Sequence, residues 1–98
     1  MILATENIKT TIHDFFKDKP VKKVWLFGSY ARGDADNDSD IDVLVDIDKD
    51  ARIGLDYFAW HLDLAEQLKK KVDVVSLGWV NHRLWPHIQK DMTIVYEK

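Results

Sequence analysis

The 98 residues of this chain include 14 Lys and Arg against 17 Asp and Glu, a formal net charge of −3, and 46% of them are hydrophobic. This composition is typical of one globular domain over residues 1–98 and excludes a disordered chain, while the absence of Cys excludes a disulfide framework and a zinc–thiolate site. No apolar run reaches the roughly 18 residues of a membrane span, and the N-terminal decapeptide lacks the basic-then-apolar pattern of a signal peptide, so we expect a cytoplasmic protein with no membrane partner.

The first predicted elements are a helix and a strand. Ile8, Ile12 and Phe15 recur at helical spacing, which predicts a helix up to about residue 17, before Pro20. Residues 21–27, VKKVWLF, are rich in β-branched and aromatic side chains and stop at Gly28. This run predicts a strand that enters a turn, and a short helix can follow it.

Residues 41–47 predict a second strand with two unlike faces, because side chains alternate along a strand. One face is apolar: Ile41, Val43, Val45 and Ile47. The other is mostly acidic: Asp40, Asp42, Asp46 and Asp48, with Leu44. We expect the first face to join the core and the second to be acidic surface.

Two helices and two strands complete the predicted order. Apolar residues recur at helical spacing over residues 54–70: Leu55, Phe58, Leu62, Ala65 and Leu68. Residues 72–77 predict a third strand, and a short helix over 84–90 leads to a fourth strand at 93–96. This alternation implies an α/β fold, with a small mixed four-stranded sheet, helices on one face and an acidic groove on the other.

The segment GSYARGDADNDSDID, residues 28–42, contains most of the candidate site. Backbone N–H groups after Gly28 and the Ser29 hydroxyl can point at a phosphate, although a Gly-Ser pair can also merely end a strand. Asp40 and Asp42, two apart on a strand, project from the same face and can share metal ions. Two Mg²⁺ ions held by carboxylates supply the charge neutralisation that nucleotidyl transfer needs.

Asp73 is the only acidic residue inside the third strand, where apolar neighbours make an unexplained carboxylate costly. We therefore consider it the candidate third metal ligand and base, with a solvent-facing strand residue as the alternative. The other clustered acids, Asp34, Asp36 and Asp38, are better explained as a solvated loop that caps and turns.

The order Gly28-Ser29, Asp40-Ile41-Asp42 and Asp73 resembles the signature of the DNA polymerase beta-type nucleotidyltransferase superfamily, specifically its branch of minimal nucleotidyltransferases (MNT). The resemblance covers nearly the whole chain and implies a polymerase beta-like fold. It implies Mg²⁺-dependent transfer of a nucleotide, usually AMP from ATP, with the Gly-Ser pair holding the terminal phosphates. The D-x-D carboxylates would bind metal, and the third carboxylate would orient or deprotonate the acceptor.

Two further residues of the segment are nucleotide-binding candidates. Arg32 can reach a phosphate, with a structural role on the helix surface as the alternative, and Ser39 lies in the S-D-I-D portion that also resembles the MNT branch. A calcium-binding loop starting at Asp34 fails on spacing, because Ser39 stands where such a loop needs Gly.

The resemblance also implies partners. Besides ATP or another nucleoside triphosphate, many MNT proteins resemble antitoxins encoded beside a HEPN-domain toxin, whose Tyr they can adenylylate. We expect the acceptor to bind from outside the chain. The alternative is a non-catalytic antitoxin, a binding module of the same fold that neutralises its partner by occlusion.

The remaining polar and aromatic residues give weaker signals. Basic residues are scattered apart from the three lysines at 69–71, so we expect no direct nucleic-acid binding, which needs a concentrated basic face. The four His show no metal-ligand spacing and are expected on the surface or in the core. The four Trp are expected in the core, with stacking on a base as the alternative for one at the groove edge: Trp25, Trp60, Trp79 and Trp85.

Overall fold

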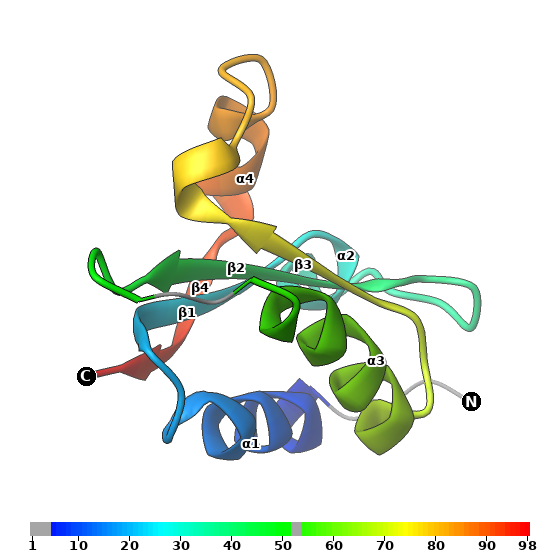
Figure 1. Cartoon of the computed structure of the whole chain (residues 1–98). Helices are drawn as coiled ribbons and strands as arrows, with labels where there is room; N and C mark the ends of the chain where they lie inside the picture. Colours follow the sequence, from blue (N-terminus) through cyan, green and yellow to red (C-terminus); the bar gives the residue numbers. More distant parts are fainter. Residues whose placement is uncertain (1–4, 52–53) are drawn as a thin grey trace.

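A mixed four-stranded sheet forms the centre of the computed structural model, which describes residues 5–51 and 54–98 (Figure 1). The strands lie in the order β3-β2-β1-β4, and their bounds are Val21–Phe27 for β1, Ile41–Ile47 for β2, Val72–Ser76 for β3 and Thr93–Glu97 for β4. β1 pairs antiparallel with β2 and β4, whereas β2 and β3 are parallel. The predicted α/β fold with a small mixed sheet is confirmed.

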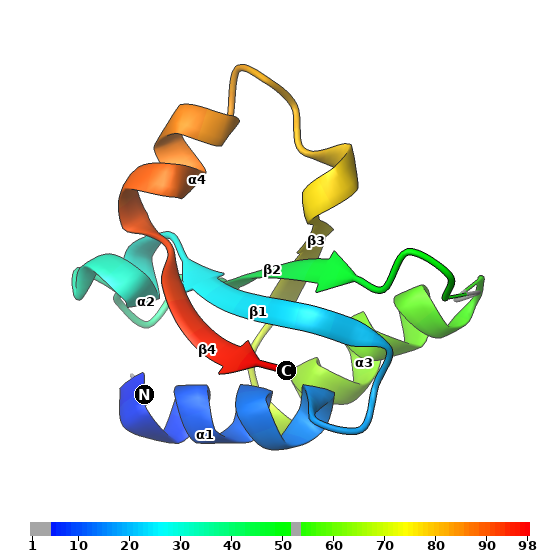
Figure 2. The same ribbon diagram turned by 90° about the vertical axis from the view of Figure 1, so that its left-hand side faces the viewer.

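Helices lie on both sides of this sheet. α1 (Thr5–Phe16) and α3 (Asp56–Leu68) cover one face, as predicted, and the short α2 (Ser29–Arg32) follows β1 (Figure 1). The 3₁₀ turn η1 (Leu77–Trp79) and α4 (Trp85–Asp91) lie on the opposite side, a placement that the prediction did not include (Figure 2). No helix within the described ranges is long and apolar enough to cross a membrane.

The main core lies between the sheet and the helix pair α1 and α3. The buried face of β2 is the predicted one, and Val43 and Val45 are fully buried there with Val24 and Leu26 of β1. Leu44 is also fully buried, although it points to the other face among acidic residues. The acidic face is therefore covered in part, where η1 contacts β2.

α3 buries only the C-terminal part of the face that its apolar spacing indicated, where Leu68 is buried and Ala65 packs against the core. Trp60, Leu64 and Leu68 are buried, whereas Leu55, Phe58 and Leu62 are 82%, 65% and 72% exposed. The helix carries two apolar stripes, and the stripe with the indole is the buried one. Because aromatic side chains bury the largest areas, the edge-to-face contact of Trp60 with Phe16 of α1, at 5.4 Å between ring centroids, accounts for this orientation.

Candidate active site

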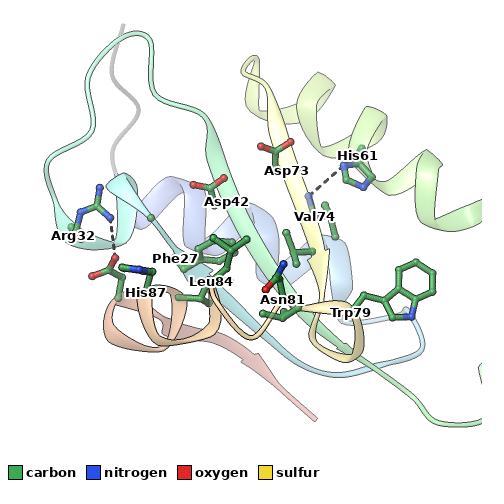
Figure 3. Close-up of a pocket in the computed structure, with 15 residues that line it drawn as sticks. Phe27, Arg32, Asp42, His61, Asp73, Val74, Trp79, Asn81, Leu84 and His87 are labelled. Atoms are coloured by element: carbon green, nitrogen blue, oxygen red, sulfur yellow. Dashed lines mark hydrogen bonds and ion pairs between the residues drawn. The ribbon is translucent and has the colours of Figure 1, made fainter.

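A pocket of about 530 Å³ opens on the side of the sheet away from α1 and α3 (Figure 3). Its floor comes from β2 and the edge strand β3, through Asp42 and Asp73, and its walls come from α2, η1 and α4. Segments far apart in the sequence, from Phe27 to Asp91, thus meet at one cavity that contains two of the three predicted carboxylates.

Asp42 and Asp73 are paired positions on neighbouring parallel strands. The register aligns Ile41 with Val72 and Asp42 with Asp73, so both carboxylates lie on the pocket side of the sheet (Figure 3). The apolar residues that flank each of them alternate to the other face and anchor both strands in the core. The alternating pattern of the two strands is therefore what fixes the direction of the two acids.

Gly28 ends β1 at a point where only glycine fits. Its φ is 78°, in the region that L side chains rarely adopt, and a Cβ built on it would collide with the Asp42 carboxylate oxygen Oδ2. Gly28 also opens α2, because its carbonyl accepts the N–H groups of Ala31 at 3.1 Å and Arg32 at 3.0 Å. The glycine thus lets the backbone of the β1–α2 turn approach Asp42 closely.

The environment of Asp42 disfavours its charged form. Partial burial, then the nearby charges of Asp73 and Asp40, raise the pKa of Asp42 from 3.8 to about 6, against smaller opposing effects of Arg32 and Lys71. A carboxylate surrounded in this way is stabilised by any cation that neutralises the cluster.

Asp40 lies just before β2 and is less directed into the pocket. Its side chain is 41% exposed, it forms an ion pair with Lys71 at 3.7 Å, and it is not among the pocket-lining residues. Across residues 5–51 and 54–98, no group of three or more His, Asp or Glu side chains is arranged to hold a metal ion. The predicted three-carboxylate set is thus represented in the pocket by the Asp42 and Asp73 pair, with Asp40 beside it.

This pair nevertheless fits a hard divalent cation. Carboxylate oxygens are the ligands that Mg²⁺ prefers, and Mg²⁺ is commonly held by one or two carboxylates together with substrate phosphates. The mutual repulsion that raises the pKa of Asp42 is the interaction that such a cation would reverse.

Arg32 extends from α2 along the wall of the pocket to α4. Its Nη1 donates to Asp91 Oδ2 at 2.9 Å (Figure 3), and its Nε donates to Asp34 Oδ2 at 3.1 Å. These hydrogen bonds, the one to Asp91 first, raise the pKa of Arg32 above its ordinary value. A permanent positive charge is therefore held beside the carboxylates, within the same cavity.

The two predicted serines do not line the pocket. Ser29 is the first residue of α2, directly after Gly28. The Ser39 hydroxyl accepts the Asp36 N–H at 2.8 Å and donates to Asp36 Oδ1 at 3.1 Å, so it closes the acidic loop. The prediction that this loop caps and turns is confirmed for Asp36, while nucleotide binding by either serine stays a prediction.

The pocket also contains two histidines that the sequence did not indicate as site residues, His61 and His87. His61 of α3 accepts the Val74 N–H at its Nδ1, at 3.3 Å, and so lies beside the edge strand next to Asp73 (Figure 3). Trp79 is not the core residue that was predicted: it is 82% exposed at the end of the pocket far from Arg32, the groove-edge position that was the alternative for one of the four Trp (Figure 3). The position of Trp79 is set by η1, a 3₁₀ turn that no short sequence pattern predicted.

Comparison with known proteins places this site in context. The family model for polymerase beta nucleotidyltransferases matches residues 9–98. The chain is 37% identical over 81 residues to a Methanocaldococcus jannaschii protein named "Putative protein adenylyltransferase", a match that covers 78% of this chain and 75% of that protein. A second protein of the same name and organism is 38% identical over 75 residues, covering 76% and 80%.

Solved structures share the fold. A structure described as a putative minimal nucleotidyltransferase superimposes with a TM-score of 0.77 at 28% identity, over 93% of this chain and 95% of that one. The MNT antitoxin in complex with a tri-AMPylated HEPN toxin from Shewanella oneidensis gives a TM-score of 0.75 at 21% identity, over 97% and 74%. At that identity, the second likeness concerns the fold alone.

Proposed function

We propose that this chain, which belongs to the polymerase beta nucleotidyltransferase family, is a Mg²⁺-dependent enzyme that transfers AMP from ATP to an acceptor protein. Family membership rests on the match over residues 9–98. The observation that carries the proposal is the pairing of Asp42 with Asp73 in one pocket, with Gly28 against the first of them and Arg32 on the wall.

In the proposed reaction, an acceptor hydroxyl oxygen forms a bond to the α-phosphorus of ATP while the bond from that phosphorus to the bridging oxygen of the β-phosphate breaks. Pyrophosphate leaves and AMP stays on the acceptor. Asp73 accepts the hydroxyl proton, because it is the carboxylate that lies opposite Asp42 in the same pocket. When bound, Mg²⁺ neutralises the charge of the phosphates.

The other residues bind and orient the triphosphate. Asp42 would hold the metal, with Asp73 and Asp40 beside it. Arg32 donates to phosphate oxygens from the pocket wall, in a planar geometry that suits phosphates. The β1–α2 turn at Gly28 and Ser29 contacts the terminal phosphates, as the family resemblance implies.

The proposed acceptor is a HEPN-type toxin. Two observations support it: relatives that the chain matches over most of their length are named as protein adenylyltransferases, and a protein of the same fold is an antitoxin in complex with an AMPylated HEPN toxin. A binding module that neutralises its partner by occlusion makes the opposite prediction about the carboxylates, since it would act without them.

The test is label transfer from ATP carrying ³²P at the α-phosphate, added with Mg²⁺ and the purified chain to a lysate of the source organism. We expect one labelled acceptor protein with the wild type and none with Asp42→Asn or Asp73→Asn. Asp46→Asn is the matched control, because Asp46 lies on β2 on the same side as Asp42 but does not line the pocket. Undiminished labelling by folded Asp42→Asn would refute the proposal.

A further inference from the structure

Large apolar side chains gather on the outer surface of α3 and on η1. Leu55, Phe58 and Leu62 follow a helical spacing of three and four residues, and are 82%, 65% and 72% exposed. Trp79 of η1, 82% exposed, joins them through Tyr57, whose ring lies 6.2 Å from that of Trp79 and 6.1 Å from that of Phe58. We call this set the α3–η1 face.

The clustering is specific to this surface. Among the described residues, six large hydrophobic side chains are exposed, and four of them form the α3–η1 face. Of the other two, Leu84 lines the carboxylate pocket and Ile94 lies on β4, at the opposite edge of the sheet from β3. A contiguous apolar patch, unlike a single exposed leucine, is typical of a surface that another molecule covers.

The α3–η1 face borders a second cavity, of about 540 Å³. Tyr57, Phe58 and Trp79 line it, together with Ile47 at the end of β2 and Ser76 at the end of β3. Trp79 also lines the carboxylate pocket. Trp79 is therefore the side chain that the two cavities share.

The charges around the face indicate what kind of molecule fits it. α3 contains no Lys or Arg, and its charged residues are all acidic and exposed: Asp56, Asp63 and Glu66. Lysines lie beyond the two ends of the helix: Lys49 at the rim of the second cavity, and the exposed Lys69 directly after Leu68. An apolar centre with an acidic rim is complementary to apolar anchors flanked by Lys or Arg.

We infer that the acceptor protein docks on the α3–η1 face with an apolar segment flanked by basic residues, and delivers its hydroxyl past Trp79 to the pocket of Asp42 and Asp73. The inference rests on the proposed function and adds where the acceptor binds and the chemistry that recognises it. In this arrangement, η1 lies between the surface that binds the acceptor and the pocket where the transfer takes place.

The decisive variant is Phe58→Ser combined with Leu62→Ser, because neither residue lines the carboxylate pocket. Its matched control is Ile94→Ser, which removes an exposed apolar side chain from the opposite edge strand. Three quantities are measured for each protein: the rate of ³²P transfer from α-labelled ATP to the acceptor in lysate, the affinity for Mg²⁺-ATP by calorimetry, and the molar mass by light scattering.

We expect the double variant to label the acceptor about tenfold more slowly or worse, since residues at the centre of an interface dominate its energy, with unchanged affinity for Mg²⁺-ATP. Ile94→Ser should match the wild type in both. A photo-crosslinking residue at position 58 should capture the same protein that receives the label.

Three results would overturn the inference. The first is that the double variant labels the acceptor at the wild-type rate. The second is that the double variant loses Mg²⁺-ATP binding as well as labelling. The third is that the crosslink joins two copies of this chain and the double variant has half the molar mass of the wild type. If the wild type binds Mg²⁺-ATP but labels no protein, the proposed transfer is wrong and the docking inference is wrong with it. If the wild type and the double variant label the acceptor at the same rate, the proposed transfer stands and only the docking inference is wrong.

Discussion

Asp42 on β2 lies directly opposite Asp73 on β3, so a parallel strand register brings together two carboxylates that are 31 positions apart in the sequence. Neither strand gains stability from the contact, because the neighbouring charge of Asp73 adds to burial in raising the pKa of Asp42. The fold therefore holds an unfavourable pair in place through the apolar residues around it, an arrangement that suits a cation site.

The first prediction concerns pH. Because the pKa of Asp42 is raised from 3.8 to about 6, the folded state binds its proton more tightly than the unfolded state does. This contribution to stability is fully present below about pH 4 and is lost as the pH rises through 6, by at most about 3 kcal/mol before solvent screening reduces it. Urea unfolding without metal, compared between wild type and Asp42→Asn at pH 4.5 and 7, measures the difference; identical pH dependence of the two proteins would contradict it.

The second prediction uses two glycines with similar backbones. Gly28 and Gly33 have φ values of 78° and 86°, but an added Cβ meets Asp42 only at Gly28 and nothing within 4 Å at Gly33. Gly33→Ala should cost about 1–2 kcal/mol of unfolding free energy from backbone strain alone. Gly28→Ala should cost more and also weaken Mg²⁺-ATP binding, because it displaces the carboxylate. Equal effects of the two substitutions in urea unfolding and calorimetry would show that the close approach is unimportant.

The third prediction concerns Arg32. If its guanidinium binds phosphate, Arg32→Ala should weaken Mg²⁺-ATP binding about tenfold, the magnitude of one charged hydrogen bond. Arg83→Ala is the control, because Arg83 is exposed and does not line the pocket. Calorimetric affinities that fall equally for both variants would point to a general charge effect, and no change for Arg32→Ala would limit this residue to its ion pair with Asp91.

The fourth prediction tests which face of α3 supports the fold. Leu64 is fully buried and Leu62 is 72% exposed, two positions apart on one helix. Leu64→Ala should lower the unfolding free energy by about 2–5 kcal/mol, and Leu62→Ala should change it by less than about 0.5 kcal/mol. Thermal unfolding measures both. A large loss for Leu62→Ala would mean that this side chain is packed within the protein, which would remove the basis of the α3–η1 face.

Patterns within one element were readable from the sequence. The ranges predicted for β1 and β2 match the observed ones to the residue, because β-branched runs ending in Gly or alternating with Asp are unambiguous. The alternation along β2 also indicated which side of the strand carries Asp42. The choice of Asp73 from the third strand agrees with its position in the pocket, although its role as base is untested.

Relations between elements were not readable in the same way. The helix of residues 56–68 has two apolar stripes, and only its packing against α1 decides that Trp60 is buried and Phe58 exposed. His61, Trp79 and His87 reach the pocket from three elements whose angles no local pattern encodes. Asp40 was predicted beside Asp42 from strand periodicity, and its charge does contribute to the raised pKa of Asp42, but it lies just before β2 begins and forms an ion pair with Lys71 that no local pattern indicated.

The most direct test of the central claim is calorimetric titration of ATP into the wild-type chain, with and without Mg²⁺, alongside Asp42→Asn and Asp46→Asn. We predict Mg²⁺-dependent ATP binding by the wild type. Binding should weaken at least about tenfold in Asp42→Asn, because this substitution removes a charged metal ligand, and should be retained in Asp46→Asn. Absence of Mg²⁺-dependent binding by the folded wild type, or equal binding by Asp42→Asn, would contradict the assignment of this pocket as a nucleotidyl-transfer site.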